Sequence, residues 1–149
     1  MSIKRFRKNT TEYIPKNSKK YVGRYPILVR SSWERMFFQL LDSNSAVLEW
    51  SSEPIGIDYY DPVQGRIRKY YPDVYMKVGN KKYIVEIKPV KDTKMPVKKG
   101  RMSEKTLRYQ KAVYFTNKAK FLAAIEYCKK MKMQFKILTE KELFTEYKK

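Results

Sequence analysis

The clearest pattern in the chain is a short amphipathic helix that begins near residue 32. Its apolar positions recur at helical spacing and are Trp33, Met36, Phe37, Leu40 and Leu41. Ser31 or Ser32 is placed to cap the amino terminus of this helix, and Glu34 falls beside the apolar stripe. The pattern therefore predicts a helix of about three turns that carries one acid to the boundary of the core.

Downstream of this helix the pattern changes to short β-prone runs. The runs cover residues 46–50, 55–60, 67–71, 74–78 and 81–88. Turn residues separate them, notably Asp-Pro followed by Gly at 61–65 and Gly-Asn at 79–80. This spacing predicts an antiparallel meander.

The last third of the chain is predicted to hold helices and one further strand. A long helix is expected to begin at Ser103, with a break near Asn117. Residues 134–138 are typical of a strand, and Glu142 stands three residues after Thr139, the spacing of a capping box. The order α, several β, α, β, α favours an α/β fold.

Charge changes the picture, because the chain has 34 Lys and Arg against 15 Asp and Glu, a formal net charge of +19. Such an excess favours a polyanionic partner, and nucleic acid is the first candidate. A membrane surface is the alternative. No apolar run approaches a spanning length, however, and residues 1–11 lack the apolar stretch of a signal peptide. We therefore expect a soluble, intracellular protein without a membrane partner.

Two segments concentrate the positive charge. Residues 1–26 are predicted to form a basic arm ahead of a single domain at 27–149, and the alternative is a solvated leader that packs partly on the core. The second segment is the loop after Pro89, which contains two helix breakers. The predicted DNA-binding residues are Arg5, Arg7, Lys8, Lys19, Lys20, Lys94, Lys98, Lys99 and Arg101.

The absence of histidine narrows the chemistry. It excludes zinc fingers, histidine-based nucleases and imidazole general bases. The single cysteine, Cys128, excludes an internal disulfide and suits a reducing compartment. Catalysis would have to depend on carboxylates and lysines, and carboxylates select hard cations such as Mg²⁺ or Mn²⁺.

Two acids and a lysine have the spacing of such a site. If Gly79-Asn80 is the tip of a two-residue hairpin, then Asp73 faces Glu86 across the strands. Two carboxylates at that separation repel each other unless they share a cation. Lys88 lies two residues after Glu86, on the same face, where its ammonium could orient or deprotonate an attacking water.

These residues have a less specific interpretation, an exposed hairpin face with scattered charges. The upstream acid Glu34 and the extreme positive charge favour the catalytic interpretation. Gln110 and Tyr114 lie four residues apart on the predicted long helix, as Q-x-x-x-Y, and are secondary candidates. For this pair we favour a solvated glutamine and a core tyrosine.

The segments Tyr71-Pro72-Asp73 and Glu86-Ile87-Lys88 resemble the PD-(D/E)xK nuclease superfamily and, within it, the TnsA-like nuclease domain. The likeness extends from residues 32–34 through residues 86–89 to residues 135–140. It is stronger still to the head completion nucleases of T-even-type tailed phages. One departure is informative: the TnsA-like motif can carry glutamine where this chain has Glu86, and the acid supports metal binding.

The resemblance implies a restriction-endonuclease-like α/β fold, a mixed central sheet flanked by helices. It implies an Mg²⁺-dependent deoxyribonuclease, with Mn²⁺ as a substitute, that acts on packaged double-stranded phage DNA during head completion, before head-tail joining. Phage head or portal-neck proteins would be its partners, and it would work in the host cytoplasm during assembly or within the virion. Asp73 and Glu86 would hold the metal, and Glu34 would complete the coordination shell of the metal. Lys88 would orient or deprotonate the attacking water.

Two other classes of function remain open at this level. A non-catalytic basic assembly protein that only binds DNA would need the charge but not the acids. A ribosome-associated RNA binder would explain the charge but not the paired carboxylates.

Overall fold

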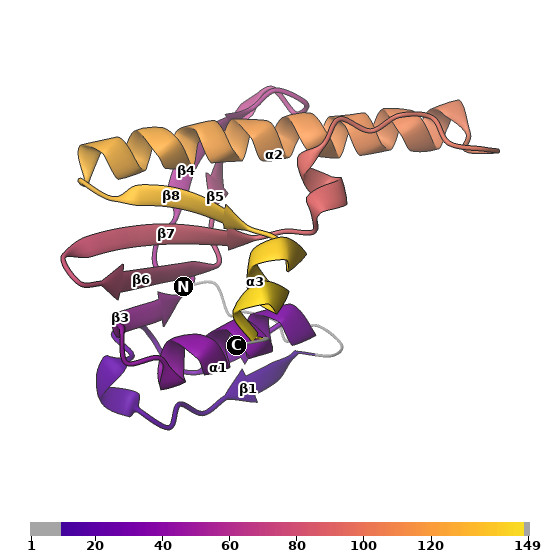
Figure 1. Ribbon diagram of the computed structural model, residues 1–149. Helices are drawn as coiled ribbons and strands as arrows, with labels where there is room; N and C mark the ends of the chain where they lie inside the picture. Colours follow the sequence, from indigo (N-terminus) through magenta and orange to yellow (C-terminus); the bar gives the residue numbers. More distant parts are fainter. Residues whose placement is uncertain (1–9, 148–149) are drawn as a thin grey trace.

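The structure is a computed structural model that describes residues 10–147 (Figure 1). Its secondary structure consists of strands, α-helices and two short 3₁₀ helices, η1 and η2. In chain order they are β1 (Thr11–Tyr13), η1 (Ser18–Lys20), β2 (Ile27–Val29), α1 (Ser32–Ser43), β3 (Val47–Ser52), β4 (Ile57–Asp61), β5 (Arg66–Tyr70), β6 (Val74–Val78), β7 (Lys81–Ile87), η2 (Val90–Thr93), α2 (Glu104–Lys130), β8 (Gln134–Leu138) and α3 (Glu140–Tyr147).

The central sheet has four strands in the order β3-β6-β7-β8. Antiparallel pairing joins β3 to β6 and β6 to β7, and parallel pairing joins β7 to β8. The parallel pair needs a long crossover connection, which α2 supplies. This mixed α/β arrangement confirms the predicted fold class.

The predicted meander is only partly correct. The β4–β5 hairpin does not enter the central sheet but forms a two-stranded sheet of its own. Its inner residues Ile57, Tyr59 and Tyr70 pack with Ala124 of α2 in a hydrophobic cluster. The apolar side chains of the hairpin are buried by packing on α2. The hairpin is therefore stabilised by the helix and not by pairing with a strand of the central sheet.

Both faces of the central sheet are covered. On one face, Val74 and Val85 pack with Phe38 of α1 and with Trp50. The opposite face is not an exposed hairpin face with scattered charges, because Ile84 is only 1% exposed and lies on the face that α2 covers. Acidic side chains on that face are therefore held in a partly apolar environment.

The described part of the predicted basic arm, residues 10–26, is folded. Strand β1 pairs with β2, and Tyr13 and Tyr21 are buried against Trp50. The chain thus folds this segment into the first hydrophobic cluster, since its tyrosines bury large rings there. Arg5, Arg7 and Lys8 lie outside the described residues.

Helix α2 is continuous from Glu104 to Lys130, and the predicted break near Asn117 is wrong. Ser103 caps its amino terminus by accepting a hydrogen bond from the N–H of Thr106. Figure 1 shows that this end of α2 extends past the edge of the central sheet. Within the part of the chain that the structure describes, no helix combines the length and apolarity that crossing a membrane would require.

The terminal helix α3 follows the predicted capping box. The Glu142 carboxylate accepts hydrogen bonds from the N–H of Thr139 at 2.7 Å and from its hydroxyl at 2.6 Å. Leu143 then enters the first hydrophobic cluster. This end of the chain is thereby fixed beside β8.

Candidate active site

A cleft of about 490 Å³ lies at the carboxyl end of β7, beside the amino terminus of α1. All four residues predicted to carry chemistry line it, namely Glu34, Asp73, Glu86 and Lys88. The other lining residues are Arg30, Ser31, Ser32, Trp33, Ile87 and Pro89. Elements far apart in the sequence therefore converge on one site.

Asp73 and Glu86 are neighbours across the β6–β7 hairpin. The predicted register is confirmed, because Val74 pairs with Val85. Asp73 comes directly before that pair, and its Oδ2 accepts a hydrogen bond from the N–H of Ile87 at 2.8 Å. Both carboxylates line the same cleft, as expected for residues that face each other across a two-residue hairpin.

Glu34 reaches the cleft from the first turn of α1. Ser31 is the residue that caps this helix, and its Oγ accepts a hydrogen bond from the N–H of Glu34 at 3.1 Å. The Glu34 Oε1 atom in turn accepts one from the N–H of Arg30 at 2.7 Å. These two bonds fix both the backbone and the side chain of Glu34, which is only 8% exposed.

The three acids are crowded and poorly solvated. Burial first, and then the negative charge of Glu86, raise the pKa of Asp73 to about 7, while the N–H of Ile87 and the Lys88 ammonium oppose the rise. Burial also raises the pKa of Glu34 and of Glu86. Carboxylates whose charged forms are disfavoured in this way favour the binding of a cation.

Lys88 supplies positive charge beside the acids. Its Nζ lies 4.0 Å from Glu86 Oε1 and 5.9 Å from the centroid of the Phe121 ring. The backbone N–H of Lys88 donates a hydrogen bond to the carbonyl of Leu138 in β8 at 2.9 Å. The backbone that carries this amine is therefore anchored to the sheet.

The donor chemistry of the cleft fits a divalent cation. Among residues 10–147, no group of three or more acidic, cysteine or histidine side chains is arranged as a complete metal-binding cluster. The recorded hydrogen bonds nevertheless engage only one oxygen of Asp73 and one of Glu34. The second oxygen of each is left for a ligand, and carboxylate oxygens are the donors that Mg²⁺ prefers.

The sequence did not single out Tyr70, which touches the site. It ends β5, is 4% exposed, and donates a hydrogen bond from its Oη to Glu86 Oε2 at 2.6 Å. Burial first, and then the charge of Glu86, raise the pKa of Tyr70 well above its ordinary value, so the hydroxyl keeps its proton. Only the position of the β4–β5 hairpin reveals this contact, and no sequence motif indicates it.

Lys120 is a second residue that sequence reasoning missed. Its Nζ lies 5.8 Å from the ring centroid of Tyr59 and 5.9 Å from that of Tyr70. Burial first, and then the Lys88 ammonium, lower the pKa of Lys120, whereas Glu86 raises it. Lys120 thus adds positive charge on the Glu86 side of the cleft.

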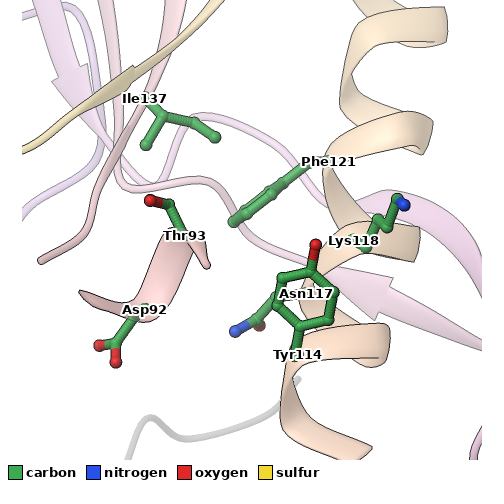
Figure 2. Close-up of a pocket in the computed structure, with 7 residues that line it drawn as sticks. All are labelled: Asp92, Thr93, Tyr114, Asn117, Lys118, Phe121 and Ile137. Carbon is green, nitrogen blue, oxygen red and sulfur yellow. The ribbon is translucent and has the colours of Figure 1, made fainter. Parts of the chain in front are cut away.

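Gln110 and Tyr114 do not line the cleft. Tyr114 instead borders a separate cavity of about 130 Å³ with residues of η2, α2 and β8 (Figure 2). That cavity is lined by Asp92, Thr93, Tyr114, Asn117, Lys118, Phe121 and Ile137. The Phe121 ring that lines this cavity also lies 5.9 Å from the Lys88 ammonium.

The basic residues predicted to contact DNA have different environments. The Lys20 ammonium donates hydrogen bonds to the carbonyls of Asp42 and Asn44 at 3.1 and 2.8 Å. Lys19 is exposed, as are Lys94, Lys99 and Arg101. Lys98 is also exposed and pairs with Glu104 at 2.8 Å.

The mixed sheet with flanking helices and a carboxylate-lysine cleft defines a nuclease of the restriction-endonuclease-like fold. Residues 44–140 match the family described as TnsA-like endonuclease N terminal. The chain belongs to this family. The match includes Asp73, Glu86 and Lys88, whereas Glu34 precedes it.

A particular relative is the head completion nuclease of Enterobacteria phage T4. It is 36% identical to this chain over 134 residues, which cover 87% of this chain and 89% of the relative. A comparison with solved structures found no match.

Proposed function

We propose that this nuclease hydrolyses phosphodiester bonds of double-stranded DNA with a divalent cation, Mg²⁺ or Mn²⁺. The observation that carries the proposal is that Asp73 and Glu86 line one cleft, with Lys88 beside Glu86. The fold and family support phosphodiester cleavage, and the net charge of +19 supports a polyanionic substrate.

Each residue of the cleft has a role in this proposal. Asp73 and Glu86 would hold the cation, and Glu34 would complete or position its surroundings. When bound, the cation supplies Lewis acidity to a phosphoryl oxygen and favours the deprotonation of water. Lys88 orients the attacking water or takes its proton and offsets negative charge that develops on the phosphate.

We also propose that the reaction belongs to phage head completion, before the head joins the tail. The support is the name of the T4 relative and the extent of the match to it. Packaged phage DNA would be the substrate, and head or portal-neck proteins would be the partners. The site of action would be the host cytoplasm during assembly, or the virion.

Replacement of Asp73 by Asn tests the catalytic proposal. The variant should lose plasmid cleavage by a factor of about 10² or more, because it removes one carboxylate of the cation site. Nicking of supercoiled plasmid is measured with Mg²⁺ and with EDTA, and circular dichroism monitors the fold.

Asp58→Asn is the matched control. Asp58 is an exposed acid whose recorded ion pair is with Lys69 on the β4–β5 hairpin, outside the cleft, so its loss should leave cleavage unchanged. Undiminished nicking by a folded Asp73→Asn protein would refute the role given to Asp73. Absence of Mg²⁺-dependent nicking by the wild-type protein would leave a basic DNA-binding protein.

A further inference from the structure

Among residues 10–147, the amino-terminal part of α2 and the loop before it form no hydrogen bond or ion pair with the rest of the fold. We call residues 94–113 the overhang. Figure 1 shows that they extend beyond the end of the central sheet where β7 terminates. The helical part of the overhang, residues 104–113, is about 15 Å long at the rise of an α-helix.

Within residues 10–147, the hydrogen bonds and the ion pair of the overhang are internal. Lys98 pairs with Glu104, the N–H of Met102 donates to the carbonyl of Lys99, and Ser103 caps the helix. Packing of α2 against the rest of the molecule is recorded from Tyr114 onward, in the cavity of Figure 2 and then in the second hydrophobic cluster. Within the described part of the chain, the second half of α2 thus packs on the fold and its first half extends away from it.

One face of α2 shows the difference directly. Tyr109, Val113, Lys120 and Ala124 are spaced so that they share a stripe of the helix. Ala124 is fully buried, whereas Tyr109 is 70% exposed and Val113 is 41% exposed. The stripe that faces the core in the second half of α2 therefore continues into the first half, where an aromatic and an aliphatic side chain on it are exposed to solvent.

Charge identifies the occupant of this surface. The overhang has seven basic residues against a single acid, Glu104. The basic residues are Lys94, Lys98, Lys99, Arg101, Lys105, Arg108 and Lys111. A second copy of the chain would bring two such surfaces together and be repelled, whereas a phosphate backbone would be attracted.

The overhang also begins at the active site. Pro89 lines the cleft, η2 follows at Val90–Thr93, and the overhang starts at the next residue. The N–H of Val90 donates to Glu140 Oε1 at 2.8 Å, which ties this junction to α3. Only the four residues of η2 therefore separate the overhang from the cleft along the chain.

We propose that the overhang is a DNA clamp that holds the duplex beside the cleavage point. Its cations contact backbone phosphates, and Tyr109 with Val113 lies against the sugars or the groove. This inference rests on the proposed function, because it places the substrate of that same cleft. The loop residues were already predicted from the sequence to contact DNA. The proposal adds the first turns of α2 to this DNA-binding surface.

The test compares two triple variants that remove the same charge. The overhang variant is Lys99→Ala with Arg101→Ala and Arg108→Ala, and the control is Lys81→Ala with Lys82→Ala and Lys130→Ala, all exposed residues. Both are made in the Asp73→Asn background so that a fluorescent duplex stays intact. Fluorescence anisotropy gives the dissociation constant over a range of salt concentrations.

The overhang variant should bind more weakly, and its slope of log K against log salt should be smaller by about 2.7, or 0.9 for each lost phosphate contact. The control should change the slope by less than one contact, roughly 0.9. Tyr109→Ala should weaken binding severalfold with an unchanged slope, because it removes an uncharged contact.

The inference fails if the overhang variant keeps the affinity and slope of its parent, or if the control loses as much. If that variant binds DNA normally, the partner of this basic surface would be an acidic protein and not DNA. Cleavage by the wild-type protein with Mg²⁺ is measured in parallel. Absence of cleavage refutes the proposed function alone, and cleavage together with unchanged binding refutes the clamp alone.

Discussion

The Glu86 carboxylate is held by groups from three parts of the chain. Tyr70 of β5 donates to one of its oxygens, and Lys88 lies near the other. Lys120 of α2 adds positive charge from beside the Tyr70 ring. A buried acid with such neighbours has few orientations available, which favours precise placement of a bound cation.

Tyr70→Phe should therefore slow cleavage while the protein remains folded. The change removes one hydroxyl and one charge-assisted hydrogen bond, so we expect the cleavage rate to fall about tenfold. The Mg²⁺ concentration that gives half-maximal cleavage should rise as well, because Glu86 loses its orientation. A plasmid-nicking assay over a series of Mg²⁺ concentrations measures both effects.

Tyr75→Phe is a matched control for that substitution. Tyr75 donates a hydrogen bond to Glu49 Oε1 at 2.7 Å, a tyrosine-carboxylate bond like that of Tyr70 but on β3 and β6. Its loss should leave the Mg²⁺ dependence unchanged. Equal effects of the two substitutions would show that Tyr70 has only a structural role.

At the scale of elements, helix α1 is tied to the segment that precedes it through Asp42. The Asp42 carboxylate accepts hydrogen bonds from the N–H groups of Lys16 and Asn17 and from the Tyr13 hydroxyl, at 2.7, 2.9 and 2.8 Å. Burial alone would raise the pKa of Asp42, but these bonds hold it below its ordinary value. The helix that carries Glu34 is positioned by this junction.

Asp42→Ala should destabilise the protein by about 2–4 kcal/mol, because the donors around the carboxylate lose their acceptor in a buried position. Urea unfolding at neutral pH measures the difference in the free energy of unfolding.

The same difference should shrink in acid. The pKa of Asp42 is lower in the folded than in the unfolded state, so its contribution is present above the ordinary value of 3.8 and is lost as the pH falls through the folded value. A difference that stays constant from neutral pH to below that range would contradict the assignment.

Elements with local signals were predictable from the sequence. Helix α1, the β6–β7 hairpin, β8 and the capped helix α3 all follow from periodicity, turn residues or caps. The β4–β5 hairpin was recognised as strands, but its departure from the sheet depends on packing against α2. Local patterns carry no information about such a partner.

In the same way, the site residues that could be predicted are those placed by a local pattern. Asp73, Glu86 and Lys88 follow from the register, and Glu34 follows from the helix boundary. Tyr70 and Lys120 reach the same acid from elements whose placement is tertiary. The hydrogen bonds of Lys20 could not be predicted for a similar reason, since their carbonyl acceptors are brought near only when residues 10–26 are packed.

At the scale of the whole molecule, stability and cation binding are linked. Like charges meet in the cleft, and a cation that binds only the folded protein stabilises it by mass action. Mg²⁺ at tenfold its dissociation constant should contribute about 1.4 kcal/mol and raise Tm by roughly 3–5 °C.

Thermal unfolding with Mg²⁺ and with EDTA measures this shift without any DNA. The Asp58→Asn protein should respond as the wild type does, and Asp73→Asn should respond much less. A similar rise in Tm for all three proteins would indicate nonspecific ion effects and would argue against a cation site in the cleft.

The parallel pairing of β7 with β8 has a consequence for the newly made chain. The hydrogen bond from the N–H of Lys88 to Leu138 forms only after the polypeptide has passed through the whole of α2 and returned. Such a contact between distant residues is made late in folding. During translation the backbone that carries Lys88 would therefore remain unanchored until the ribosome has delivered β8.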